Sequence, residues 1–286
     1  MGVLNLTPDS FSDGGRLGST EAVLRQARRM LAQGAHVLDL GAQSTRPGAQ
    51  MVGPAEELRR LLPALEALEP LRREHPQLLI SIDTFEAAVA EAALAAGADW
   101  INDVRGANHS PAAPGGTLRD TAMLPLIAAA GCPYVLMHSR GSSQTMDSLA
   151  VYADVVHDVL TELQAASNEA LAAGVKPEQL LWDPGLGFAK TTAQNLELLR
   201  RLPELTAVTA PGVSDPYPVL VGPSRKRFIG AVLDEPRPRA RLWGTAAVCA
   251  LATAAGARVL RVHDVGPIAK TVRMVAAVSA PTASDW

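Results

Sequence analysis

Polar side chains recur at or near the ends of short apolar runs along this sequence. They are mostly carboxylates, carboxamides and imidazoles, namely Asn5, Asp39, Asp83, Asn102, Asp103, His138, Asp183 and His263. A single residue of this kind is usually a helix cap or a loop partner, and His138 alone is typical of a core histidine. Their repetition at the same end of successive runs predicts one common site.

Cationic groups are concentrated in a few of these places, at Arg46, Arg225, Lys226, Arg261 and His263. Arg261 and His263 are two residues apart in an extended run, so both side chains point to one face. The helix expected after Asp264 would direct its positive N-terminus to the same place. We therefore expect an anion there. The alternative is a salt bridge from this pair to Asp264 or Asp9, and Asp264 could also cap the helix.

Asp83, Asn102 and Asp183 would lie near the centre of the site. Buried carboxylates need hydrogen-bond donors, and a flat heterocycle with an amino-pyrimidinone edge offers donors to Asp183 and an acceptor to Lys226. The residues thus predict a ligand with a nitrogen heterocycle deep in the protein and an anionic tail at the rim. For Asp103, a salt bridge to Arg105 is the simpler interpretation.

The elements that must position these groups alternate along the chain. Runs rich in strand-forming residues, apolar almost throughout, occur at 2–6, 36–41, 78–83, 99–104, 133–138, 180–183, 218–222 and 258–262. Amphipathic helical stretches separate them; the first has Ser19 or Thr20 as a candidate N-cap and ends at Gly34. This alternation predicts an α/β protein, a single-domain (β/α)8 TIM barrel, with active-site loops at the carboxyl ends of the strands. A doubly wound sheet is the alternative, but no G-x-G-x-x-G follows a strand.

Composition limits the class of protein further. The 286 residues are 48% hydrophobic and 19% charged, with a net charge of −3, so neither nucleic acid nor an anionic membrane is an expected partner. Two cysteines provide no disulfide framework and suit a reducing compartment. We expect a cytoplasmic protein, or a mitochondrial one if a targeting segment precedes the first strand, which begins without a lead-in.

Metal motifs are weak. The segment 9–15, DSFSDGG, hints at a calcium loop, but Phe11 and Thr20 occupy two positions that need ligands. The six histidines show neither H-E-x-x-H spacing nor a Cys/His cluster, which argues against structural zinc.

A set of motifs then appears in order on the predicted strands: LNLTPDSFSDGG, STRPGA, SIDT, IND, DPGLGFAKT, GPSRK and RVHDV. Together they resemble the dihydropteroate synthases, the folate-pathway members of the pterin-binding barrel family. The resemblance covers nearly the whole chain and implies one domain over residues 1–286. The segments NLELLR, GPSRKRF and RLWGTAAV look closer to eukaryotic forms, such as the fungal ones, which are often one domain of a multifunctional folate-synthesis protein.

The resemblance implies a reaction and its participants. In this family p-aminobenzoate displaces diphosphate from 6-hydroxymethyl-7,8-dihydropterin diphosphate and yields 7,8-dihydropteroate, with Mg2+ as cofactor. It also implies a homodimer, a sulfonamide target and, in fused forms, upstream folate-pathway domains.

Residues matching the family motifs take specific roles by this resemblance. The pterin would be held by Asp83, Asn102, Met137, Asp183 and Lys226. The diphosphate would be held by Asn5, Arg261 and His263, with Mg2+ near Asn5. The p-aminobenzoate would be framed by Thr45, Arg46, Pro47, Phe188 and Ser224. Asp183, Lys226, Arg261 and His263 are the residues implied in catalysis, and the first two loops would form a lid over the site.

The sequence departs from the family pattern at Ala42, Gln43 and Ser139, which puts details of the lid in question. Two rival functions remain at this point. A pterin-binding methyltransferase of the same barrel family would not need STRPG, SRK or RVHDV, and a non-catalytic pterin-binding domain would not need Lys226, Arg261 and His263.

Overall fold

The computed structural model describes residues 1–6, 16–43, 51–110 and 116–279. The expected contacts of Thr45, Arg46 and Pro47 lie outside these residues, as does most of the predicted lid, whose two loops fall largely in 7–15 and 44–50.

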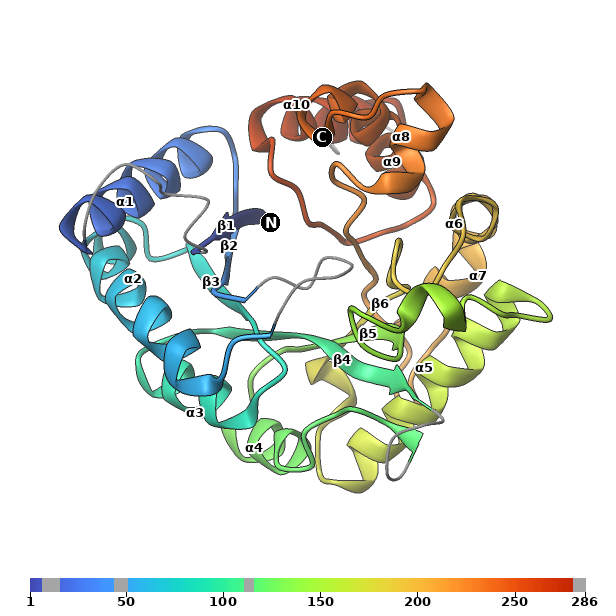
Figure 1. The fold of residues 1–286 in the computed structure, drawn as a ribbon, viewed down its shortest axis with the longest axis horizontal. Coiled ribbons are helices and arrows are strands. Elements are labelled where there is room, and N and C mark those ends of the chain that lie inside the picture. Colours follow the sequence, from blue (N-terminus) through green and yellow to red (C-terminus); the bar gives the residue numbers. More distant parts are fainter. Residues whose placement is uncertain (7–15, 44–50, 111–115, 280–286) are drawn as a thin grey trace.

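The described residues form eight parallel strands that close into a barrel, which confirms the predicted fold class (Figure 1). β1 to β6 pair in sequence order, and β7 pairs with β8. Isolated bridges between Trp182 and Val219 and between Gly2 and Val262 complete the ring. The strands are Gly2–Asn5 (β1), Val37–Gly41 (β2), Leu79–Asp83 (β3), Trp100–His109 (β4), Tyr134–Arg140 (β5), Leu180–Asp183 (β6), Leu220–Val221 (β7) and Val259–Leu260 (β8).

Helices surround this ring, and α8, α9 and α10 form one group on its outside (Figure 1). The helices are Arg16–Ala32 (α1), Pro54–Glu74 (α2), Ala87–Ala95 (α3), Met123–Ala130 (α4), Val155–Ala172 (α5), Thr192–Arg200 (α6), Leu202–Thr206 (α7), Arg227–Leu233 (α8), Leu242–Ala254 (α9) and Val265–Ser279 (α10). Short 3-10 helices occur at Met146–Leu149, Pro177–Gln179 and Pro238–Arg241. No helix among the described residues is long and apolar enough to cross a membrane.

Local sequence explains most of these boundaries. Asp154 begins α5 because its carboxylate accepts the backbone N–H groups of Val156 and His157. Gly34 follows α1 with a φ of 97°, a conformation that glycine adopts without strain. The predicted N-cap of α1 at Ser19 or Thr20 is wrong, since the helix begins at Arg16 and continues through both residues.

β4 differs most from its predicted range. It continues to His109, and its pairing with β5 shifts register between Asp103 and Ala107. Such an irregularity redirects the side chains that follow it. Beyond the irregularity, the Asn108 side-chain amide donates hydrogen bonds to Ser139 Oγ and to the Gly141 carbonyl, at 2.8 Å each.

Candidate functional site

Strand register brings the predicted heterocycle-binding residues together at the carboxyl ends of the strands. Asp83 lies opposite Asn102 on neighbouring strands, and Met137 lies opposite Asp183. All four are buried. Parallel strands end at one side of the barrel, so these side chains share its mouth. The structure therefore places this part of the predicted site in one region.

Asp39 joins the members of this group. It is fully buried, and its Oδ1 accepts the Ser81 hydroxyl at 2.6 Å. The Asn102 amide lies 3.4 Å from both of its oxygens, and Arg261 Nε lies 2.6 Å from Oδ2. The sequence analysis noticed this carboxylate within a strand but gave it no role. A charged residue inside an otherwise apolar strand was the signal that could have identified it.

Arg261 points into the barrel and bridges two carboxylates. Its Nη2 lies 2.5 Å from Asp83 Oδ2 in addition to the contacts with Asp39. Burial raises the pKa of Asp83 to about 7, while the Arg261 guanidinium opposes that change. The alternative partner considered for Arg261, Asp264, is instead bound by Arg225 at 2.7 and 3.0 Å. The Asp9 alternative lies outside the described residues.

Asp183 and Lys226 are buried groups whose charges interact at the loop after β6. The Asp183 carboxylate is buried and accepts the Gly185 N–H at 2.7 Å. Burial lowers the pKa of Lys226 to about 8, and the charge of Asp183 opposes that change. The Lys226 ammonium donates to the Leu186 carbonyl and lies 4.9 Å from the centre of the Phe188 ring. The Lys226 amine thus lies beside the Phe188 ring, and its charge interacts with that of the buried Asp183 carboxylate.

Ser224 and His263 form one unit at the other side of the mouth. His263 Nδ1 lies 2.9 Å from Ser224 Oγ, and the His263 backbone N–H donates to the same oxygen at 3.2 Å. Ser224, which is predicted to bind the second substrate, therefore contacts His263, which is predicted to bind the diphosphate. Both follow short strands, β7 and β8.

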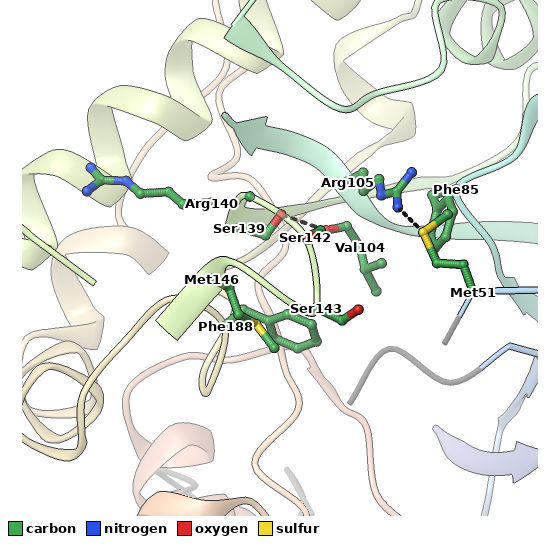
Figure 2. Close-up of a pocket in the computed structure, with 11 residues that line it drawn as sticks. Met51, Phe85, Val104, Arg105, Ser139, Arg140, Ser142, Ser143, Met146 and Phe188 are labelled. Carbon is green, nitrogen blue, oxygen red and sulfur yellow. Dashed lines mark hydrogen bonds between the residues drawn. The ribbon is translucent and has the colours of Figure 1, made fainter. Parts of the chain in front are cut away.

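A pocket of about 410 Å³, counted with its open mouth, lies beside Phe188 (Figure 2). Phe188 and Met146 line one side, while Phe85, Arg105 and Met51 stack together on the other. The Arg105 guanidinium carbon is 3.6 Å from the Phe85 ring centre. Phe188 also packs against a buried cluster of Phe85, Val104 and Met137. These contacts give a flat ligand an apolar wall.

The simpler interpretations of Asp103 and His138 have different outcomes. Asp103 does not form a side-chain salt bridge with Arg105; it accepts the Tyr134 hydroxyl at 2.6 Å and the Arg105 backbone N–H at 2.7 Å. His138 is a fully buried core histidine with partners on both ring nitrogens, as that interpretation expected. One of these partners is Lys190, which the sequence analysis did not single out.

Two departures from the family pattern hold neighbouring backbone. Gln43 Oε1 accepts the Val52 N–H at 2.8 Å, at the far end of the second loop. Ser139 Oγ donates to the Val104 carbonyl at 2.9 Å. Both side chains therefore have structural partners in this chain.

Asn5, the predicted metal ligand, ends β1 and is partly exposed. The described residues contain no group of three or more His, Cys, Asp or Glu side chains that could hold a metal ion. Magnesium commonly keeps several waters and binds through one or two carboxylates together with substrate phosphates. For the Asn5 carboxamide oxygen to be a ligand, substrate phosphates and water would have to supply the other positions.

Comparison with known proteins identifies the family of this chain. The description "Pterin binding enzyme" belongs to the family that matches residues 1–263. A dihydropteroate synthase of Synechocystis sp. is 46% identical over 278 residues, covering 97% of this chain and 89% of that protein. A mitochondrial folate synthesis bifunctional protein of Arabidopsis thaliana is 42% identical, covering 93% of this chain and 47% of that protein.

A solved structure is also similar. The dihydropteroate synthase of Xanthomonas albilineans with 4-aminobenzoic acid has a TM-score of 0.85 at 40% identity, covering 99% of this chain and 93% of that one. Sequence and fold agree over almost the full length, and the chain belongs to the pterin-binding enzymes and, within them, to the dihydropteroate synthases.

Proposed function

We propose that the chain joins p-aminobenzoate to 6-hydroxymethyl-7,8-dihydropterin diphosphate, giving 7,8-dihydropteroate and diphosphate. The observation that carries this proposal is the mouth of the barrel, where Asp83, Asn102 and Asp183 come together with Lys226 and Arg261. The 46% identity to a dihydropteroate synthase supports the same reaction.

The pterin ring would lie deep in the barrel. Its amino and ring N–H groups would donate to Asp183 and Asp83, and Asn102 would complete the polar edge. Lys226 would donate to the ring carbonyl, while Met137 and Phe188 would cover the faces. Every one of these side chains lies in the mouth or on the loop after β6.

The second substrate would lie between Phe188 and Ser224, with Thr45, Arg46 and Pro47 completing its site. The arylamine nitrogen attacks the pterin methylene carbon, and the bond from that carbon to the diphosphate oxygen breaks. The oxygen keeps the electron pair, and the nitrogen releases a proton to solvent. An arylamine is a weak base, so this step needs no strong general base.

Departure of diphosphate is the step that needs charge stabilisation. Arg261 and His263 would supply it from the segment between β8 and the N-terminus of α10. Asn5 would hold Mg2+, which neutralises phosphate charge when bound. The Asp183 carboxylate would favour the positive charge that develops on the pterin methylene.

Two broader assignments complete the proposal. Large apolar side chains are exposed on three neighbouring helices, at Val232, Leu233, Trp243, Leu251, Met274 and Val278, and such patches commonly mark protein interfaces. We assign this face of α8, α9 and α10 to a homodimer.

We place the reaction in the cytoplasm, with the mitochondrion as the alternative, and in fused relatives other folate-pathway domains would join this one.

The direct test mixes both substrates with purified protein and Mg2+ and measures diphosphate release and dihydropteroate. Both products should appear in equal amounts and require both substrates. A protein that binds the pterin but releases no diphosphate would instead be a pterin-binding module.

A further inference from the structure

Lys190 is a buried amine on the loop that follows β6. Only 8% of its surface is exposed. Its Nζ lies 2.9 Å from His138 Nδ1, 3.0 Å from the Phe188 carbonyl and 3.1 Å from the Gly185 carbonyl. Three acceptors surround the nitrogen, which matches the three N–H donors of an ammonium group. The proposed reaction gives this side chain no role.

The partners of Lys190 lie on β5 and on its own loop, and they fix its orientation. The Glu162 carboxylate can only accept, so the His138 ring proton resides on Nε2; because burial lowers the pKa of His138 to about 4, its Nδ1 carries no proton and accepts from Lys190. That Nε2–H donates to Glu162 Oε2 at 2.9 Å. Glu162 belongs to α5 and also accepts from the Arg140 guanidinium. A continuous hydrogen-bonded chain therefore runs from α5 through β5 to the loop after β6.

Of the two carbonyls held by Lys190, one belongs to Phe188 of the proposed site and the other to Gly185, which bonds Asp183. Gly185 donates its N–H to Asp183 Oδ1 at 2.7 Å, so the same peptide segment orients the carboxylate. Phe188 carries the ring that faces Lys226 and the pocket of Figure 2. One side chain thus constrains both the Asp183 carboxylate and the Phe188 ring.

The loop is closely fitted at this point. Gly185 has a φ of 64°, and a Cβ added there would overlap the His138 carbonyl oxygen. Asn195 holds the other end, accepting the Gly187 N–H at 2.6 Å and donating to the Lys190 carbonyl at 3.2 Å. A loop held this closely has little freedom to compensate for the loss of Lys190.

We propose that Lys190 is a positioning residue for the reaction, which it serves by fixing Asp183 against the pterin and Phe188 against the arylamine. This inference rests on the proposed function. Lys190 itself touches neither substrate. Small errors of placement are costly in a reaction that depends on alignment, on the order of a hundredfold for about 1 Å.

The experiment compares Lys190→Met, which keeps the length of the side chain, with Lys176→Met, an exposed control just before the short helix Pro177–Gln179. Lys190→Met should lower kcat by about ten- to a hundredfold and raise KM for p-aminobenzoate several-fold. Lys176→Met should change neither parameter. A variant with lower thermal stability but unchanged kcat and KM would show a purely structural role and overturn the proposal.

Milder changes keep the test decisive if Lys190→Met does not fold. Glu162→Gln and His138→Gln loosen the chain behind Lys190 without removing it, and should shift the same two parameters by about three- to tenfold. Activity of the wild type tests the proposed function, and calorimetric titration of wild type and variant with the pterin tests the positioning role of Lys190. An inactive wild-type protein would refute the proposed function, whereas equal pterin affinity in wild type and Lys190→Met would refute the positioning of Asp183.

Discussion

Arg261 Nη2 lies 2.5 Å from Asp83 Oδ2, so in this structure a residue proposed for the diphosphate is paired with a residue proposed for the pterin. A pterin that donates to Asp83 must use Oδ1, share Oδ2 with Arg261 or displace the guanidinium. Asp39 offers Arg261 a second carboxylate, at 2.6 Å, that no substrate needs. Arg261 can therefore turn toward the diphosphate while it keeps one partner.

Arg261→Ala should separate these two roles. Affinity for the pterin diphosphate should fall by about 1.5–3 kcal/mol, the range for charged hydrogen bonds, while affinity for the pterin alone stays nearly unchanged. The unliganded variant should also lose about 3 kcal/mol of unfolding free energy, because two buried carboxylates lose their cation. Calorimetry and urea unfolding measure these effects. Arg227→Ala, an exposed neighbour paired with Asp147, is the control; normal diphosphate affinity in Arg261→Ala would move the anion site elsewhere.

Asp183→Asn should keep the fold and weaken the pterin by about 1.5–3 kcal/mol. The asparagine oxygen can still accept the Gly185 N–H, so the loop remains in place. The charge and one acceptor are lost. Calorimetric titration with a pterin decides the question, with the exposed Asp147→Asn as control. Equal affinity in the two variants would remove Asp183 from the pterin site.

Glu57→Gln should stabilise the protein in a pH-dependent way. Both Glu57 carboxyl oxygens are buried with no partner in good hydrogen-bond geometry, and burial raises the pKa of Glu57 from 4.5 to about 7, with the Thr84 hydroxyl opposing that change only in part. The folded state therefore holds this proton to higher pH than the unfolded state, and wild type loses stability as pH rises through that interval.

The gain from Glu57→Gln should be small at pH 4 and reach about 2–3 kcal/mol at pH 8. Urea unfolding at both pH values measures it. Glu66→Gln, an exposed change on the same helix, should show no such gain. A gain that is the same at pH 4 and pH 8 would contradict a buried ionised carboxylate.

Gly185→Ala should destabilise the protein by about 3 kcal/mol or more, because the new methyl group overlaps the His138 carbonyl and the backbone is left-handed. Gly174→Ala has a similar backbone, with φ of 93°, but its methyl group would meet only Ala128 Cβ at 3.6 Å. It should cost about 1–2 kcal/mol. Thermal unfolding of both variants compares steric overlap plus backbone strain at Gly185 with backbone strain alone at Gly174. Equal losses of stability would show that the loop after β6 adapts to the methyl group.

The local pattern of apolar and polar residues predicts most of the strands, but it does not predict which side chains pair inside the site. Strands such as 180–183 were located to the residue because apolar runs bounded by loop residues are a local signal. The partners of Arg261 lie 178 and 222 residues away in sequence, so they depend on barrel closure. Lys190 was missed for a related reason, since a lysine in a loop looks solvated until its acceptors are known.

Barrel closure has a consequence for local opening. β7 and β8 pair with each other, but among the described residues they join the other six strands through isolated bridges at Val219 and Val262. Hydrogen bonds such as Val3 N to the Val262 carbonyl, 2.9 Å, form that seam. Amide hydrogens along it should exchange through sub-global openings that leave β2 to β5 protected. Arg261 follows β8 and bonds Asp39 of β2 and Asp83 of β3, so it stabilises the junction between β8 and β1 from inside the barrel.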